Sequence, residues 1–139
     1  MAVITKKIKL NTQGDTDIID ITHDVAAILS KANVKNGIVT VFVSGSTGGL
    51  TTVEYEPGLV QDLKSFFEKI APKAGTYQHN VQWHDGNGYA HVRASLLGPS
   101  VSIPFADGEL LLGTWQQIIF IDFDNRPRNR ELVVQIVGE

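Results

Sequence analysis

The sequence predicts a single α+β domain, residues 1–139, built mainly from antiparallel strands. About nine segments have the composition of strands, and only two have the spacing of helices. The strand segments occur in runs, without the regular alternation of strand and helix that is typical of a parallel sheet. At 139 residues, the chain suits one domain with its own core. So many strands in a small domain leave edges to be covered, and self-association is one way to cover them.

The first third of the chain predicts two strands and one helix. Residues 2–10 alternate apolar and polar side chains, and residues 17–21 form a second, short strand. Thr22 can cap the helix that follows, with Asp24 in the first turn, where the helix dipole favours an acid. The buried stripe of this helix consists of Val25, Ile28 and Leu29.

The middle of the chain predicts two more strands and a second helix. Residues 37–43 are almost continuously apolar, which is typical of a central strand, and residues 50–56 form a weaker one. Pro57 is well placed to open the helix, and Pro72 ends it. Apolar residues recur between them at helical spacing: Val60, Leu63, Phe67 and Ile70.

The last third predicts five strands separated by turns that are rich in glycine, proline and asparagine. They are residues 88–97, 100–105, 109–113, 115–123 and 131–137. In the first of these, alternation places Ala90 and Ala94 on an apolar face. It places His91 and Arg93 together on a polar face.

The composition excludes several functional classes. The net charge of −3 supplies no basic field for nucleic acid, and no apolar run approaches the roughly 18 residues of a membrane span. The first residues lack the apolar core of a signal peptide. Cysteine is absent, which removes disulfides, thiol catalysis and thiolate metal ligands together. We therefore expect a cytoplasmic protein without nucleic-acid or membrane partners.

Three of the four histidines lie in one polar segment, residues 77–95. On the predicted strand, His91 and Arg93 could grip a phosphate or pyrophosphate, because arginine offers a planar fork of donors and histidine adds another. The alternative is that these are ordinary polar residues of a strand face. Asp85 and Asn87 also favour a turn, so they are open to a purely structural interpretation.

The same segment offers ligands for a divalent metal, zinc or magnesium. His79 and His91 are separated by a turn, and Asp85 can complete a three-ligand set that leaves a position open for substrate. The spacing matches no specific zinc signature, so structural roles for these residues stay open as well.

The segment "SGSTGG", residues 44–49, is the second candidate site. Backbone N–H groups in a Gly-rich bend form a concave anion site, to which hydroxyl groups add donors. It is neither a P-loop nor a nucleophile elbow, because the motifs for both are absent. A simple hairpin bend is the alternative. The residues that would contact an anion are Gly45, Ser46, Thr47 and Gly48.

Two further groups of charged residues are weaker candidates. Glu54 and Glu56 alternate along a strand and could bind a divalent ion, although solvated carboxylates are the default. The arginines of "NRPRNR", residues 126, 128 and 130, are typical of a solvated turn more often than of a phosphate site.

The segments "YQHN", "DGNGYAHVRASLLGPS", "GELLLGTWQQIIFIDFDNRPR" and "VVQIVGE" together resemble the YjbQ-like family. Members of this family are often described as secondary thiamine-phosphate synthases. That reaction joins a pyrimidine diphosphate to a thiazole phosphate and releases pyrophosphate. The resemblance covers nearly the whole chain, and the combination of these motifs in order is specific.

The resemblance implies a two-sheet sandwich that assembles as a homotrimer around a polar, metal-binding pocket for a small phosphorylated metabolite. Carried over, the pocket includes His79, Asp85, Asn87 and His91, with Thr47 and Glu54 from the loop and the strand after it. One departure stands out. Many relatives have a histidine at the position of Gly45, so a three-histidine metal site does not carry over intact; His84 is an extra imidazole that could substitute.

Two rival functions use the same residues. One is a metal-dependent hydrolase of a phosphorylated metabolite, with water as the nucleophile. The other is a non-catalytic trimeric protein that binds such a metabolite or a metal. At 139 residues the chain is also well short of the ~250 residues of a TIM barrel, the scaffold of the dedicated thiamine-phosphate synthases.

Overall fold

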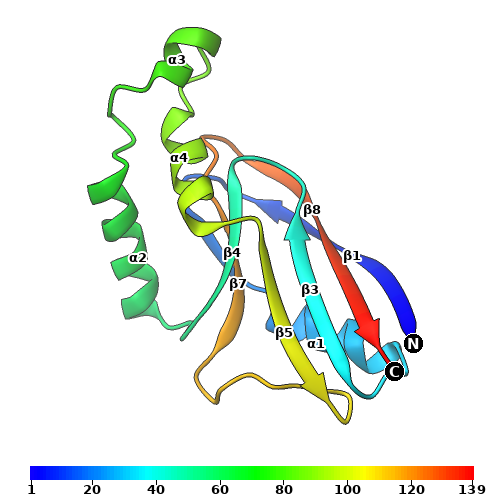
Figure 1. Cartoon of the computed structure of the whole chain (residues 1–139). Helices are drawn as coiled ribbons and strands as arrows, with labels where there is room; N and C mark the ends of the chain where they lie inside the picture. The colour runs from blue at the N-terminus through cyan, green and yellow to red at the C-terminus, as the bar shows by residue number, and fades with distance from the viewer.

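Two antiparallel sheets carry the fold (Figure 1). The computed structural model describes all residues 1–139. The larger sheet has the strand order β1-β8-β3-β5-β6, and the smaller one has the order β2-β7-β4. The strands are β1 (Ala2–Thr12), β2 (Asp17–Asp20), β3 (Gly37–Val43), β4 (Gly48–Val53), β5 (Ser100–Ala106), β6 (Glu109–Leu110), β7 (Gln117–Asp122) and β8 (Arg128–Gly138). The predicted α+β class with antiparallel pairing is confirmed.

Four helices complete the fold, rather than the two that the sequence predicts. They are α1 (Thr22–Lys31), α2 (Pro57–Ile70), α3 (Gln78–Trp83) and α4 (Gly88–Leu97). Figure 1 shows α2 and α4 along the outer side of β4 and β7, while α1 lies at the end that holds both termini. The short helix α3 projects beyond the sheets at the other end. None of the four is long and apolar enough to cross a membrane.

Strand β7 is buried on both faces and joins two hydrophobic clusters. Ile118 and Phe120 pack into the cluster formed with the larger sheet and α1. Ile119 and Ile121, on the opposite face, pack against residues of α2 and α4. Because successive side chains of a strand point to opposite faces, one apolar run supplies both clusters. The smaller sheet therefore lies between the larger sheet and the helices α2 and α4.

The prediction of a strand at residues 88–97 is wrong, because this segment forms helix α4. Ala90 and Ala94 alternate with polar residues, but they are also four residues apart, which is helical spacing. Both pack into the cluster with β7, and Leu97 packs against its edge. The small alanines fit a helix closely against the sheet, and this packing decides between the two periods.

Several element boundaries also differ from the predictions. The strand predicted at 109–113 is only two residues long, and the last strand begins at Arg128 rather than at residue 131. Thr22 is the first residue of α1 and not its cap; its hydroxyl donates to Asp20 Oδ1 at 2.7 Å and accepts from Ile118 N at 2.8 Å. Pro57 opens α2 as predicted.

Candidate functional site

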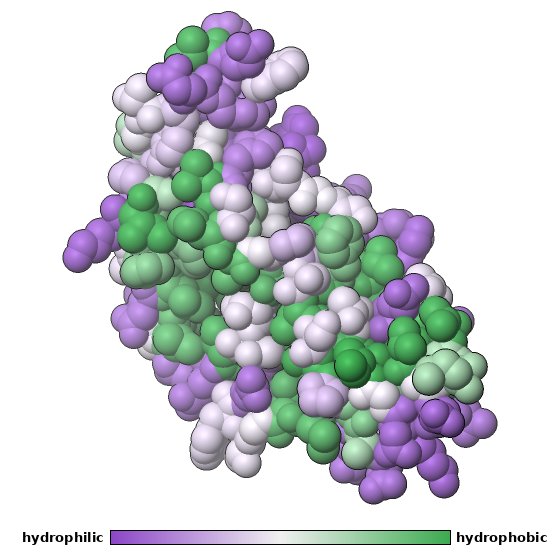
Figure 2. All heavy atoms as spheres, in the orientation of Figure 1, coloured by the Kyte–Doolittle hydropathy of each residue, from purple (hydrophilic) through white to green (hydrophobic).

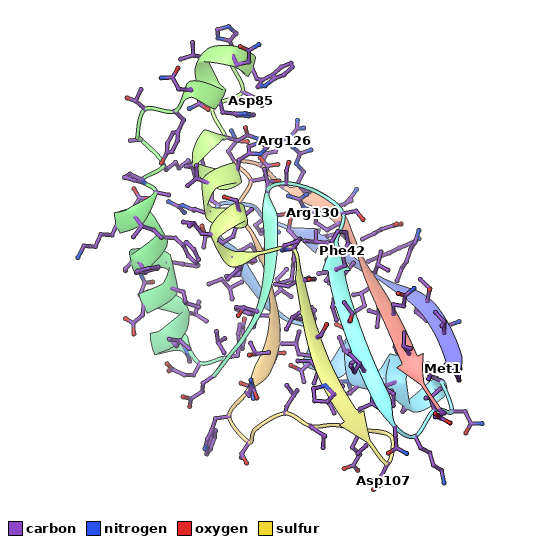
Figure 3. All side chains as sticks on the ribbon, in the orientation of Figure 1. Met1, Phe42, Asp85, Asp107, Arg126 and Arg130 are labelled. Carbon is purple, nitrogen blue, oxygen red and sulfur yellow. The ribbon has the colours of Figure 1, made fainter.

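A polar cavity of about 450 Å³ lies at the end of the sandwich below α3. Its walls come from the β3–β4 loop, the α3–α4 segment, the β7–β8 loop and the first residues of β8. Figure 3 labels Asp85 and Arg130 at this end of the molecule. Its size suits a small metabolite. The lining residues are Gly45, Ser46, Thr47, His79, Trp83, Asp85, Asn87, His91, Asp124, Arg128 and Arg130.

The cavity brings together two segments that the sequence singles out. Gly45, Ser46 and Thr47 come from the glycine-rich loop. His79, Asp85, Asn87 and His91 come from the histidine-rich segment more than thirty residues later. A larger cavity of about 690 Å³ lies between α1 and the β5–β6 hairpin, but no histidine or arginine lines it. We therefore take the smaller cavity as the candidate site.

Arg93 does not belong to the site, contrary to the prediction. Successive residues of a helix are turned by about 100°, so His91 and Arg93 face nearly opposite directions on α4. Arg93 is 4% exposed and lies on the side of α2. Its Nε and Nη2 donate to Ala71 O at 2.9 and 2.8 Å, and its Nη1 donates to Thr16 Oγ1 at 2.8 Å. Nη2 also pairs with Glu68 at 2.8 Å.

Glu54 is also outside the site. Strand β4 begins at Gly48, which pairs with Asp122 near the cavity, and ends at Val53, which pairs with Gln117. Glu54 follows that far end, roughly 20 Å along the strand, and it is exposed. Glu56 instead caps α2 by accepting from the backbone N–H groups of Gly58 and Leu59.

Gly48 and His84 are near the site but do not line it. Gly48 is buried in β4, where a Cβ would meet the Phe120 ring at 2.7 Å, so packing explains this glycine. His84 is exposed and ends α3 with a left-handed backbone, φ 58°. It therefore does not supply the third histidine that the resemblance implies near position 45.

Close packing of α3 against α4 places the two site histidines together. A Cβ on Gly88 would lie 2.5 Å from Tyr77 Cβ, so only glycine allows this approach. Asn80 Oδ1 accepts from Gly88 N at 2.8 Å and fixes the start of α4. The rings of His79 and His91 then lie 4.2 Å apart between centroids, with 47° between their planes.

A short hydrogen-bond chain orients His79. Its Nε2 lies 3.0 Å from Asn87 Oδ1 and 3.3 Å from Asp85 Oδ1. Asn87 Nδ2 donates to Asp124 Oδ1 at 3.2 Å, which fixes the amide with its oxygen toward His79. Because both neighbours of Nε2 are acceptors, we assign the proton of His79 to Nε2.

The pKa of His91 is shifted in the direction that favours the neutral imidazole. Burial lowers its pKa below the usual value of 6.5, and the adjacent His79 lowers it further. The carboxylates of Asp85 and Asp124 oppose this shift without reversing it. A neutral imidazole that faces a cavity can accept a proton from a bound molecule.

Two buried carboxylates hold two arginines at the base of the cavity. Asp122 is fully buried and binds Arg130 through two parallel bonds, Nε–Oδ2 at 2.9 Å and Nη2–Oδ1 at 2.8 Å. Asp124 is 1% exposed and pairs with Arg128 through Nε at 2.8 Å and Nη2 at 2.7 Å. Thr47 Oγ1 accepts from Arg130 Nη2 at 2.8 Å. This network ties the glycine-rich loop to β8.

Two of the charged groups in this network, Asp124 and Arg130, have pKa values shifted toward the ionised form. Burial works against the charge of Asp124, but hydrogen bonds from Asn87, the Asn125 backbone and Arg128 hold its pKa below the usual value. The hydrogen bonds that Arg130 donates to Asp122 raise the pKa of Arg130. Nη1 of Arg128 and Nη1 of Arg130 take part in none of these bonds. Each arginine therefore has donors left for a ligand in the cavity.

The sequence does not single out Asp122 and Asp124, and it marks the arginines only as a weaker candidate. The arginines of residues 126–130 were interpreted as a solvated turn, which is correct only for the exposed Arg126. A period-two pattern was available: Asp122 and Asp124 lie two residues apart, and so do Arg128 and Arg130. On extended chain such pairs share a face, so this pattern could have indicated the network.

The side chains do not form a complete metal centre. No group of three or more histidine, aspartate or glutamate side chains is arranged to hold a metal ion. His79 directs Nε2 at Asn87, and Gly45 supplies no ligand. The residues of this chain therefore do not fit the predicted three-ligand site.

The chain is therefore a small two-sheet α+β protein with a cavity lined by histidine and arginine. The chain belongs to the YjbQ family: the family described as "UPF0047 protein YjbQ-like" matches residues 6–139. The resemblance seen in the sequence motifs is confirmed.

Relatives match the chain over nearly its full length. A UPF0047 protein of Methanothermobacter thermautotrophicus is 38% identical over 139 residues, covering 100% of this chain and 95% of the relative. Among solved structures, a YbjQ-like protein of unknown function from Sulfolobus solfataricus has a TM-score of 0.94 at 33% identity and covers 99% of both chains. A YjbQ/UPF0047 protein from Clostridium acetobutylicum has a TM-score of 0.86 at 38% identity, covering 95% of this chain and 99% of that one.

Proposed function

We propose that the cavity binds the phosphoryl group of a small metabolite and that His91 exchanges a proton with it. The observation that carries this proposal is the pair of arginines whose Nη1 groups are free of the network that fixes Arg128 and Arg130. An anchored guanidinium loses little side-chain freedom on binding a phosphate and offers directed donors.

The glycine-rich loop supports the same interpretation. The backbone N–H groups of Gly45 and Ser46 donate no hydrogen bond within the chain, and both residues line the cavity. The backbone of Gly45 lies outside the left-handed region, so its conformation does not demand glycine. A Cβ there would lie 3.3 Å from Arg130 Nη1. The missing side chain therefore leaves room for a ligand oxygen beside that donor.

The reaction that family resemblance suggests fits these groups. In a thiamine-phosphate synthase, the carbon–oxygen bond between the pyrimidine substrate and its leaving pyrophosphate breaks. The same carbon then bonds to the ring nitrogen of the thiazole phosphate. Arg128, Arg130 and the loop amides would stabilise the charge that develops on the leaving pyrophosphate. A divalent ion would enter with the diphosphate as part of the substrate. The thiazole nitrogen that forms the new bond carries no proton, so His91 would contact the diphosphate through a hydrogen bond in this reaction, and His79 would be held in place by Asn87.

Product formation tests the synthase proposal directly. Purified protein is incubated with the pyrimidine diphosphate and the thiazole phosphate, with and without Mg²⁺ or Zn²⁺, and thiamine phosphate is measured. We expect turnover by the parent and by His23→Ala, whose histidine lies on α1 away from the cavity. We expect loss of turnover in His91→Ala and Asp85→Ala. No product from the parent under any of these conditions would rule out the synthase proposal.

The same assay separates the two rival functions. A hydrolase would release phosphate or pyrophosphate from one substrate without the second, because a neutral His91 can accept a proton from water as well. A binding protein would retain both ligands without any turnover. Each outcome keeps the phosphoryl site and changes only the chemistry assigned to it.

We further propose that the protein assembles as a homotrimer. Figure 2 shows apolar side chains gathered on the visible face over α2 and α4 and across β3 and β5. Phe66 and Ile70 of α2, Leu96 of α4, and Ile38 and Phe42 of β3 are each at least 41% exposed. Such patches mark interaction surfaces. Analytical ultracentrifugation should give a trimer, and a stable monomer at micromolar concentration would refute this assembly.

A further inference from the structure

Trp83 is the single hydrophobic residue among the eleven that line the candidate site. It is 66% exposed and belongs to neither hydrophobic cluster. Its indole N–H also donates no hydrogen bond within the chain. A tryptophan usually buries its large ring, because that ring contributes strongly to core stability. Core packing therefore does not account for this residue.

The geometry of α3 directs Trp83 toward the cavity. Trp83 follows His79 by four residues on the same helix, and residues at this spacing lie one above the other on one face. His79 is fixed in the site by Asn87, so this face of α3 is the cavity face. The ring of His91 lies beside His79. All three rings line the cavity that Arg128 and Arg130 also line.

We propose that Trp83 is a stacking surface for a planar unsaturated ring, so that the ligand is a phosphate ester or diphosphate of an aromatic or heteroaromatic compound. This proposal rests on the proposed phosphoryl site and adds the residue that would recognise the organic part. The cavity of about 450 Å³ has room for a ring besides the phosphoryl group. Stacking of a planar ring on an aromatic side chain discriminates by shape without requiring hydrogen bonds.

A matched pair of ligands tests the proposal. Phenyl phosphate and cyclohexyl phosphate carry the same phosphoryl group and rings of similar size, but only the first ring is planar. Their dissociation constants are measured by calorimetry, with inorganic phosphate as the ligand that lacks a ring. We expect the parent protein to bind phenyl phosphate about 5- to 150-fold more tightly than cyclohexyl phosphate.

Substitutions of Trp83 should change this preference selectively. Trp83→Leu keeps an apolar side chain but should lose the preference, whereas Trp83→Phe should keep part of it. Inorganic phosphate should bind equally well to all three proteins. Circular dichroism checks that both variants fold, which the exposure of Trp83 favours.

The chain offers its own spectroscopic control, because Trp83 and Trp115 are the only tryptophans. Trp115 is 72% exposed between β6 and β7 and does not line the cavity. Phenyl phosphate should change the fluorescence of Trp115→Phe, in which Trp83 is the remaining indole. It should leave the fluorescence of Trp83→Phe unchanged.

The possible failures are distinguishable. Equal affinity for the two ring ligands, with phosphate binding intact, would overturn this inference and leave the phosphoryl site standing. Absence of phosphate binding by the parent would overturn both. A trimer that dissociates in Trp83→Leu, with no fluorescence response in Trp115→Phe, would show that a second copy of the chain covers the indole, and would overturn the inference as well.

Discussion

Helix α4 separates two polar clusters that look alike in the sequence but differ in what their donors do. On one side, Arg93 directs its donors at Ala71 O, Thr16 Oγ1 and Glu68. On the other side, Arg130 binds Asp122 and Thr47 and leaves Nη1 unused beside Gly45. The donors of Arg93 all bind groups of the protein, whereas Arg130 is held by the protein and keeps one donor for a ligand.

The neighbours of Arg93 confirm that its cluster is closed. Tyr89 OH and Lys73 Nζ both reach Asp15 Oδ1 at 2.8 Å. Burial raises the pKa of the Tyr89 hydroxyl, and the hydrogen bond to Asp15 raises it further, so the phenol stays protonated. Only about 150 Å³ of space is left beside this cluster, compared with about 450 Å³ at the site. Satisfied donors and little space together indicate a structural role.

The largest expected effect is on stability, from Arg93→Met. Removing the guanidinium leaves the Ala71 carbonyl and the Thr16 hydroxyl without their partner in a buried setting. We expect the free energy of unfolding to fall by about 3 kcal/mol, measured by urea denaturation. The affinity of the folded protein for phosphate should not change. A loss of phosphate affinity in the folded fraction would place Arg93 in the site after all.

Gly45→Ala should have two smaller effects: it should stabilise the fold and weaken phosphate binding. The backbone at Gly45 accepts an alanine, so the substitution should stabilise the fold by about 0.4–1 kcal/mol through the unfolded chain. The new Cβ should at the same time crowd Arg130 Nη1 and weaken phosphate binding by up to about tenfold. Thermal unfolding and calorimetry on one sample measure both. Unchanged phosphate affinity would show that ligand oxygens do not use this space.

The smallest expected effect is a pH dependence from His91. Its pKa is lowered in the folded state, so below pH 6.5 the unfolded chain binds more protons than the folded one. The free energy of unfolding should therefore decrease as pH falls from about 6.5 toward the lowered pKa. His91→Asn should flatten this part of the profile, whereas His23→Asn should not. Parallel profiles for the parent and His91→Asn would show that His91 does not cause this pH dependence.

A separate loss of stability is expected from Asp124 in stronger acid. Its pKa is lowered in the folded state, so its contribution is present above the usual value of 3.8. That contribution is lost as pH falls below this value and through the lowered pKa. The two groups thus act in different pH ranges, and a stability profile measured from pH 3 to pH 8 separates them.

The fold class and most of the residues that line the site were predicted from the sequence, for identifiable reasons. Alternating or continuous apolar runs located the long strands, and Pro57 located the start of α2. The glycine-rich loop was found because its composition is local. The segment at 88–97 fits both helical and strand periods, and only its contact with β7 decides between them.

The charged residues of the site that were not predicted, Asp124, Arg128 and Arg130, depend on contacts that are distant in the sequence. Thr47 meets Arg130 across 83 residues, and Asn87 meets Asp124 across 37. Such pairs follow from the way in which the two sheets and α4 pack together, which no local pattern specifies. An arginine in an ion pair and a solvated arginine therefore look alike in the sequence. Only the fold distinguishes Arg126 from Arg130.

The most direct test of the account is the titration of inorganic phosphate into the parent, Arg130→Lys and Arg126→Lys, measured by calorimetry at one salt concentration. Lysine keeps the charge beside Asp122 but loses the donor beside Gly45. The account predicts that Arg130→Lys binds phosphate about tenfold more weakly than the parent, because one charge-assisted hydrogen bond is lost. Arg126→Lys, which is outside the cavity, should match the parent. Equal affinity of the two variants would contradict the claim that an anchored arginine with a free donor makes this cavity a phosphoryl site.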